Sequence, residues 1–254
     1  MDRIAGTGMR PCYNGDEQAA VTACVDLPAS VAYDPFGRLC FTDQANQIIR
    51  MIDENGIIHC IAGTQPLTNP HTPQLGFAGD EGPAISAKLF FEAGQVADPS
   101  GKLCFDAAGN MYIADTRNHA VRMVDGAGII HRFAGAAPVG GVGQAGFSGD
   151  GALAIDAKLN EPRDVAADAD GNILIADTGN NVIRMVKPDG TITTLVGVQR
   201  PVNSIPLVGN QVLAEDGFAA RDVHITGPAG VEVDSQGRVW IADTQSNVIR
   251  ILYR

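Results

Sequence analysis

Short apolar segments alternate with polar turns along nearly the whole chain. One apolar-then-polar string recurs four times, as LCFTDQANQIIRMI from Leu39, MYIADTRNHAVRMV from Met111, ILIADTGNNVIRMV from Ile173 and VWIADTQSNVIRIL from Val239. An Asp-x-x-Gly turn precedes each string, and an apolar strand precedes each turn. Each unit therefore predicts strand, tight turn, strand, loop, strand, tight turn, strand, which is a four-stranded antiparallel meander.

The second strand of each unit is apolar on both of its faces. Residues of both alternations are hydrophobic, as in Leu39, Cys40 and Phe41 or in Val239, Trp240 and Ile241. A strand buried on both faces must lie between two other layers. Four such sheets packed radially make an all-β, four-bladed β-propeller. We expect one domain over residues 1–254, with units near 4–60, 61–132, 133–194 and 195–254.

The two ends of the chain predict how the ring closes. Arg3–Thr7 resembles the fourth strand of a unit, and Val248–Leu252 resembles the third. We expect the N-terminal segment to pair with the last blade, which would close the ring and remove two exposed strand edges. The alternatives are that the chain is part of a longer array of repeats, divided at this point within a unit, or that two chains together make an eight-bladed ring.

The repeated motif G-N-x-x-I-A-D-T-x-N-x-x-I-R, the turn before it and the x-A-G-T strand after it resemble NHL repeats. The resemblance covers nearly the whole chain and departs most in the first unit, where Thr42-Asp43-Gln44 replaces Ala-Asp-Thr. NHL propellers more often have six blades than four. The resemblance implies a propeller but leaves the function open, because the family includes protein- and ligand-recognition modules, sensors, some RNA-binding members and lyase or lactonase relatives.

The composition of the chain limits the classes of partner that the protein is expected to bind. The chain has 29 acidic and 18 basic residues, which give a net charge of −11 and argue against a nucleic-acid partner. No apolar run approaches the ~18 residues of a membrane span. Five cysteines without a CxxC motif predict neither a disulfide framework nor a zinc site. Cys12 and Cys24 flank one connector and would pair only in an exported protein. No signal peptide is apparent, so a cytoplasmic protein and a trimmed extracytoplasmic domain both fit.

An aspartate and an arginine recur seven residues apart in every unit. We interpret them as structural ion pairs rather than as an acidic ring around a cation, because a residue common to every blade serves the scaffold. No metal and no cofactor are therefore expected. The aspartates are Asp43, Asp115, Asp177 and Asp243, and the arginines are Arg50, Arg122, Arg184 and Arg250.

The connectors between blades form a second repeated feature. Residues 77–89 match residues 147–159, and an aspartate followed by an Ala-rich stretch predicts an N-capped helical turn. We expect these connectors to gather around the mouth of the central channel. An aromatic residue recurs in them and is read as a plug under the loops, or alternatively as part of a ligand-stacking ring: Tyr13, Phe77 and Phe147.

Residues that break the repeat are the best candidates for function. Four charges occupy inner-strand positions at which sister units have small or apolar residues: Lys102, Arg163, Asp164 and Glu232. They either pair with one another or mark a polar site at the channel mouth. His119 and His224 are placed to approach the same face as general bases.

These features favour a recognition module with a protein, peptide or small-molecule ligand on the connector face. The first alternative is a small-molecule enzyme of the hydrolase, lyase or isomerase type with a polar site at the channel mouth. The second is a structural or oligomerising module of a larger assembly, including a homo-oligomer. A deep polar pocket would favour the enzyme, and a broad apolar patch would favour protein binding.

Overall fold

The computed structural model describes residues 1–68, 71–92, 99–198, 217 and 219–253. Its strands form the predicted meander sheets, each ordered from inner to outer strand. Blade one consists of β2 (Pro28–Tyr33), β3 (Leu39–Asp43), β4 (Ile48–Ile52) and β5 (Ile57–Ala62), and blade two of β9 (Leu103–Phe105), β10 (Met111–Asp115), β11 (Ala120–Val124) and β12 (Ile129–Ala134). Blade three consists of β13 (Pro162–Ala167), β14 (Ile173–Asp177), β15 (Val182–Val186) and β16 (Ile192–Val196). Blade four consists of β17 (Pro228–Val233), β18 (Val239–Asp243) and β19 (Val248–Leu252). The predicted four-bladed all-β fold is confirmed.

The tight turns follow from their Asp-x-x-Gly sequence. In the first blade, Asp34 Oδ1 accepts hydrogen bonds from the backbone N–H of Phe36 at 3.0 Å and of Arg38 at 2.8 Å. Gly37 then adopts a φ of 79°, which is the left-handed backbone that glycine reaches without a steric penalty. The turn sequence thereby fixes the register in which β2 pairs with β3.

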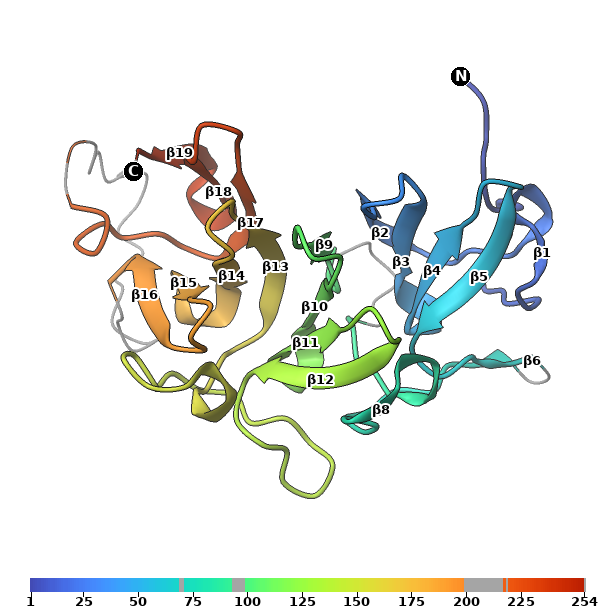
Figure 1. The fold of residues 1–254 in the computed structure, drawn as a ribbon, viewed down its shortest axis with the longest axis horizontal. Helices are drawn as coiled ribbons and strands as arrows, with labels where there is room; N and C mark the ends of the chain where they lie inside the picture. The colour runs from blue at the N-terminus through green and yellow to red at the C-terminus, as the bar shows by residue number, and fades with distance from the viewer. Residues whose placement is uncertain (69–70, 93–98, 199–216, 218, 254) are drawn as a thin grey trace.

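Three of the four hydrophobic clusters in the described residues lie between consecutive blades, and the fourth lies within blade one and the segment that precedes it. Cys40 and Ile49 of blade one pack with Leu103 and Ile113 of blade two, and the same pattern joins blade two to three and three to four. The second strands are buried on both faces in the first three blades, as predicted. Figure 1 shows the blades following one another about a common centre, with β9, β13 and β17 on the inside.

The connectors run along the rim of the molecule. Short strands β1 (Gln18–Ala19) and β8 (Gly82–Pro83) add to the outer edges of β5 and β12. The 3-10 turn η3 (Ala84–Ser86) then bridges two blades, since Ala84 O accepts from Gly63 N and Ala84 N donates to Gly128 O, both at 2.9 Å. The helical turns of the connectors therefore lie between outer strands and not at the channel mouth, where the sequence had suggested them.

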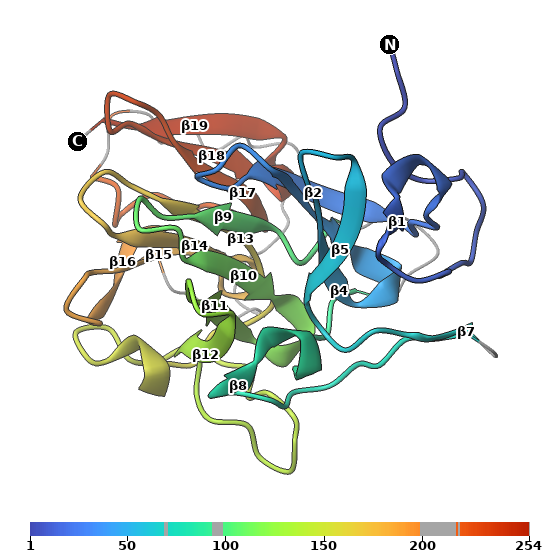
Figure 2. The ribbon, with the colours of Figure 1, turned by 45° about the vertical axis from the view of Figure 1, so that its right-hand side comes forward.

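The predicted closure of the ring is wrong in its pairing. Among the described residues, the sheet of blade four contains only β17, β18 and β19, and residues 3–7 form no strand. Gly6 N instead donates to Ala20 O at 3.0 Å, within the first blade. The two ends of the chain lie on opposite sides of the molecule in both views (Figures 1 and 2). The repeat pattern identified a missing strand correctly but did not determine which blade would hold the segment.

Candidate binding site

The repeated aspartate organises one end of every blade. One carboxylate oxygen accepts the backbone N–H that leads into the inner strand of the same blade, at 2.7–2.8 Å, as Asp43 does from Asp26. The other oxygen faces the arginine seven residues later, at distances of 3.2, 3.3, 3.5 and 2.8 Å in blades one to four. In the first three blades an asparagine three residues after the aspartate donates to this second oxygen: Asn46, Asn118 and Asn180.

The connectors complete these ion pairs. Asp16, Asp80 and Asp150 bind Arg50, Arg122 and Arg184 at 2.7, 2.6 and 2.8 Å. The recurring aromatic rings lie against the same guanidinium groups, with Tyr13, Phe77 and Phe147 centred 5.4, 4.9 and 4.5 Å from them. No side-chain cap forms at the helical turns, so the predicted N-capping is wrong. The connector aspartate binds the arginine instead, which is a stronger, charge-assisted partner. The matching connector positions of blade four lie outside the described residues.

Burial governs the protonation of the repeated aspartates. The side chains of Asp43, Asp115 and Asp177 are fully shielded from water, and burial raises the pKa of each to about 6. Their hydrogen bonds and their arginine partners act in the opposite direction and lower the pKa, but burial has the larger effect. At neutral pH they are ionised and paired. These residues have every contact that a scaffold requires and face no opening.

The charged residues that break the repeat meet at the inner strands. Lys102 Nζ of blade two donates to Asp164 Oδ2 of blade three at 3.0 Å and to Ala229 O of blade four at 2.7 Å. Asp164 Oδ2 also accepts from Val231 N of blade four at 3.0 Å. Burial raises the pKa of Asp164, and the Lys102 ammonium opposes that rise. Two side chains thus join three blades.

Lys102 and Asp164 occupy the same repeat position in blades two and three, and the other two blades show which side chain the fold requires there. Ser30 occupies it in blade one, where its Oγ accepts from Leu103 N at 3.4 Å, and Gly230 occupies it in blade four. A small residue is therefore sufficient for the scaffold. The Lys102 and Asp164 side chains keep 25% and 13% of their surface exposed, so the pair remains accessible to a ligand.

The other candidate residues are placed differently. Glu232 is exposed on β17, two residues after Gly230, and its charge, with that of Asp164, raises the pKa of the Cys104 thiol beyond the rise caused by burial. Arg163 precedes Asp164 on β13 with a half-buried side chain. His224 lies on the entry to blade four, where its carbonyl oxygen accepts from Arg250 Nη2 at 3.4 Å.

His119 has a structural partner. It ends the loop helix η4 (Thr116–Asn118) with a left-handed φ of 51°, and its Nδ1 accepts from Glu161 N of the next blade at 3.1 Å. Gln47 and Asn181 occupy the same position and accept from Phe91 N at 2.6 Å and Gly227 N at 2.7 Å. Burial lowers the pKa of His119, which keeps the imidazole neutral and able to accept.

Sequence reasoning missed Arg117 on the same loop. Its guanidinium bridges Glu92 and Glu161, which belong to the entries of blades two and three, and its side chain is 35% exposed. The sequence does mark Arg117 as an exception, because the sister loops have the uncharged residues Ala45, Gly179 and Gln245 at this position. Arg117 is a second charge that breaks the repeat on the loop end of the blades.

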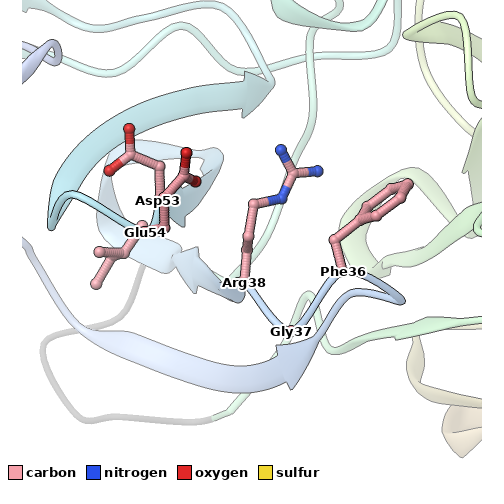
Figure 3. Close-up of a pocket in the computed structure, with 6 residues that line it drawn as sticks. Phe36, Gly37, Arg38, Asp53 and Glu54 are labelled. Atoms are coloured by element: carbon pink, nitrogen blue, oxygen red, sulfur yellow. The ribbon is translucent and has the colours of Figure 1, made fainter.

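A hollow of about 260 Å³ lies at the other end of blade one, between its two tight turns (Figure 3). Phe36, Arg38, Asp53 and Glu54 line it, and the Arg38 guanidinium lies 5.2 Å from the centre of the Phe36 ring. Arg38 also donates to Asp34 Oδ2 at 2.7 Å. No sequence pattern indicates this hollow, since it depends on the placement of the exposed Phe36 in the turn between β2 and β3.

Metal and thiol chemistry add no further site in the described part of the chain. No group of three or more histidine, cysteine or acidic side chains there is arranged to hold a metal ion. Cys12 and Cys24 are free thiols, and burial raises the pKa of Cys12 to about 12. Among the same residues, no helix has the length and apolar character to cross a bilayer.

Radial meander sheets, cores between neighbouring blades and an ion pair that recurs in each repeat unit define a β-propeller. The family model of the teneurin NHL domain matches residues 142–214. Human teneurin-4 is 25% identical over 258 residues, which cover 98% of this chain and 9% of that relative. The repeats of this chain are thus similar to those of NHL propellers, and the chain spans 9% of the length of this relative.

Solved structures agree on the fold. An auxiliary nutrient binding protein from Bacteroides thetaiotaomicron matches with a TM-score of 0.56 and 15% identity, over 88% of this chain and 47% of that one. A gluconolactonase from Xanthomonas campestris matches with a TM-score of 0.52 and 13% identity, over 94% of this chain and 60% of that one. One is a binding protein and the other an enzyme, so the shared fold alone does not decide the function.

Proposed function

We propose that this propeller is a recognition module that binds a protein segment, a peptide or a small molecule at the loop ends of blades two to four. The Lys102–Asp164 pair carries this proposal, because sister blades fill the same position with Ser30 and Gly230. A buried charge pair contributes little to stability compared with a small apolar or polar residue. Its presence on the inner strands therefore favours a role in binding.

The hydrogen bonds of the pair indicate the chemistry of the ligand. Asp164 already accepts from Lys102, Val165 and Val231. The Lys102 ammonium has three donors, and groups in the described part of the chain accept two of them. Its third donor is available to a carbonyl or carboxylate oxygen. We infer a ligand that presents such an oxygen, with Arg117 and Glu232 at the margin of the site.

Replacement by the residue of a sister blade tests the proposal, with each ligand-induced shift measured from the variant's own Tm because Lys102→Ser leaves Asp164 without its ammonium partner. Lys102→Ser introduces the side chain that blade one has at Ser30, and Lys187→Ser removes a lysine from an exposed turn as the control. In a thermal-shift screen of carboxylates and peptides, we expect a ligand that raises the Tm of the parent and of Lys187→Ser but not of Lys102→Ser.

A shift that persists in Lys102→Ser would contradict the proposed site. Asp164→Ser extends the comparison, since a serine hydroxyl can still accept the Val231 N–H as Ser30 does from Leu103. A compound that the protein converts rather than retains, detected by mass spectrometry, would favour the enzyme alternative.

A further inference from the structure

Blades one and four each present a face that is covered in every other blade. We call the side of blade one that carries Val31 the entry face, and the side of blade four that carries Ile249 the exit face. Val31 is 69% exposed, whereas its equivalents Leu103, Val165 and Val231 are 3–5% exposed. Ile249 is 68% exposed, whereas Ile49, Val121 and Ile183 are fully buried. Tyr33 and Trp240 extend the two apolar faces.

Each internal joint between blades uses a polar contact that the two open faces could also make. Gln47, His119 and Asn181 each accept a hydrogen bond from the N–H of the next blade at 2.6–3.1 Å. On the exit face Asn247 has the corresponding position and a φ of 58°. On the entry face Leu27 has the donor position and a φ of 54°, close to the 48° of Glu161 and the 55° of Gly227.

The joint between blades three and four also uses a hydroxyl contact. Thr178 Oγ1 of blade three donates to Pro228 O of blade four at 2.6 Å. Thr244 occupies the equivalent position on the exit face and Pro28 the equivalent position on the entry face, and both are exposed. The two open faces are therefore complementary in apolar surface and in hydrogen-bonding groups, by the same contacts that join the blades within the chain.

The N-terminal segment indicates which blade the entry face receives. Gly63, Gly135 and Gly197 end a fourth strand, and each donates its N–H to the carbonyl oxygen of an alanine of the following connector at 2.9–3.0 Å. Gly6 donates to Ala20 O at 3.0 Å in the same way, and Ala5 packs with the apolar residues of the entry face. Residues 3–7 thus stand where the fourth strand of a preceding blade would end. The blade that fits beside them needs three strands, as blade four has in the described residues.

We propose that the entry face receives blade four of a second copy of this chain, with residues 3–7 of the first copy adding a fourth strand beside β19 of the second. Within one chain the two faces lie at opposite ends of the row of blades (Figure 1). A head-to-tail contact of this kind closes into a ring when the rotations add to a full turn. Two copies supply eight blades, which is within the usual range of about four to eight for propellers.

The test uses one variant for each face and a control on the rim. Val31→Arg places a charge on the entry face, Ile249→Arg places one on the exit face, and Ile85→Arg places one on an exposed connector residue. All three side chains are exposed in the single chain, so each variant is expected to fold, which circular dichroism checks. Size-exclusion chromatography with light scattering should give the parent and Ile85→Arg twice the mass of 26.5 kDa, and the two face variants the single mass.

Mixing the two face variants separates this arrangement from the others. Val31→Arg keeps an intact exit face and Ile249→Arg keeps an intact entry face, so an equimolar mixture should regain a dimer through one joint. A parent that is monomeric at every soluble concentration would overturn the proposal, as closure of a single chain on itself predicts. A dimer that both arginine variants leave intact, or a mixture that remains monomeric, would overturn it as well.

Discussion

The Asp115–Arg122 pair shows how one residue holds several segments together. Arg122 is fully buried, contacts Asp115 of its own blade and Asp80 of the connector, and stacks on Phe77. Two carboxylates, the fully buried Asp115 and the partly exposed Asp80, therefore share one buried guanidinium for charge compensation. Breaking a buried pair from one side is far more damaging than its presence is stabilising, because it leaves an uncompensated charge.

We expect Arg122→Met to lower the free energy of unfolding by about 3–5 kcal/mol in urea titrations. Arg250→Met is the matched variant in blade four and should have a smaller effect, since the Arg250 side chain is 15% exposed to water. The double variant Asp115→Asn/Arg122→Met should recover part of the loss. Equal losses at Arg122 and Arg250 would show that burial does not set the strength of these pairs.

At the scale of an element, the loop that follows each second strand joins one blade to the next. Its last residue takes a left-handed backbone and offers a side-chain acceptor to the neighbouring blade. His119 appeared in the sequence as a candidate general base, but in the structure its Nδ1 makes the contact that Gln47 and Asn181 make with amide oxygens. The chemistry of the contact, and not the identity of the side chain, is what repeats.

Substitutions at His119 distinguish a structural role from a catalytic one. His119→Asn should leave the stability close to that of the parent, because an amide oxygen replaces Nδ1 as acceptor for the Glu161 N–H. His119→Ala should lower the free energy of unfolding by about 1–3 kcal/mol, since that N–H loses its partner. Thermal and urea unfolding of both variants measure the difference. A destabilised His119→Asn would show that the ring itself is required.

At the scale of the molecule, stability comes from the joints between blades, and the two end faces are the exception. Equivalent side chains differ in burial only because of their place in the row: Ile183 is fully buried against blade four, and Ile249 is 68% exposed. The same residue in the same repeat position therefore has a different energetic role in the last blade than in the internal ones.

This difference predicts unequal results for one substitution made twice. Ile183→Ala should lower the free energy of unfolding by about 2–5 kcal/mol, as the loss of a buried aliphatic side chain does. Ile249→Ala should change it by less than about 0.5 kcal/mol in a single chain, since its side chain is exposed there. Urea unfolding at concentrations low enough to keep chains apart gives both values. A large effect of Ile249→Ala under those conditions would indicate closure within one chain.

Much of the fold could be read from local sequence. The Asp-x-x-Gly turns, the two-sided apolar strands and the aspartate–arginine spacing act over a few residues, so their recurrence predicts the blades and their number. The candidate pair Lys102–Asp164 could also be named, because a charge that breaks a repeat is visible without a structure. Their partnership, and the contact with Ala229, required three strands that are up to 127 residues apart in the chain.

The sequence by itself determined the repeat, the meander of each blade and the all-β class, since turn geometry and hydrophobic alternation are local properties. Only the tertiary structure decided where the connectors lie, which blade holds residues 3–7, and that Val31 and Ile249 remain exposed. These three features depend on the angle by which each blade is rotated relative to the one before it. The angles add along the chain, so no single repeat determines them. The function proposed for Lys102 and the docking proposed for the end faces both follow from that arrangement.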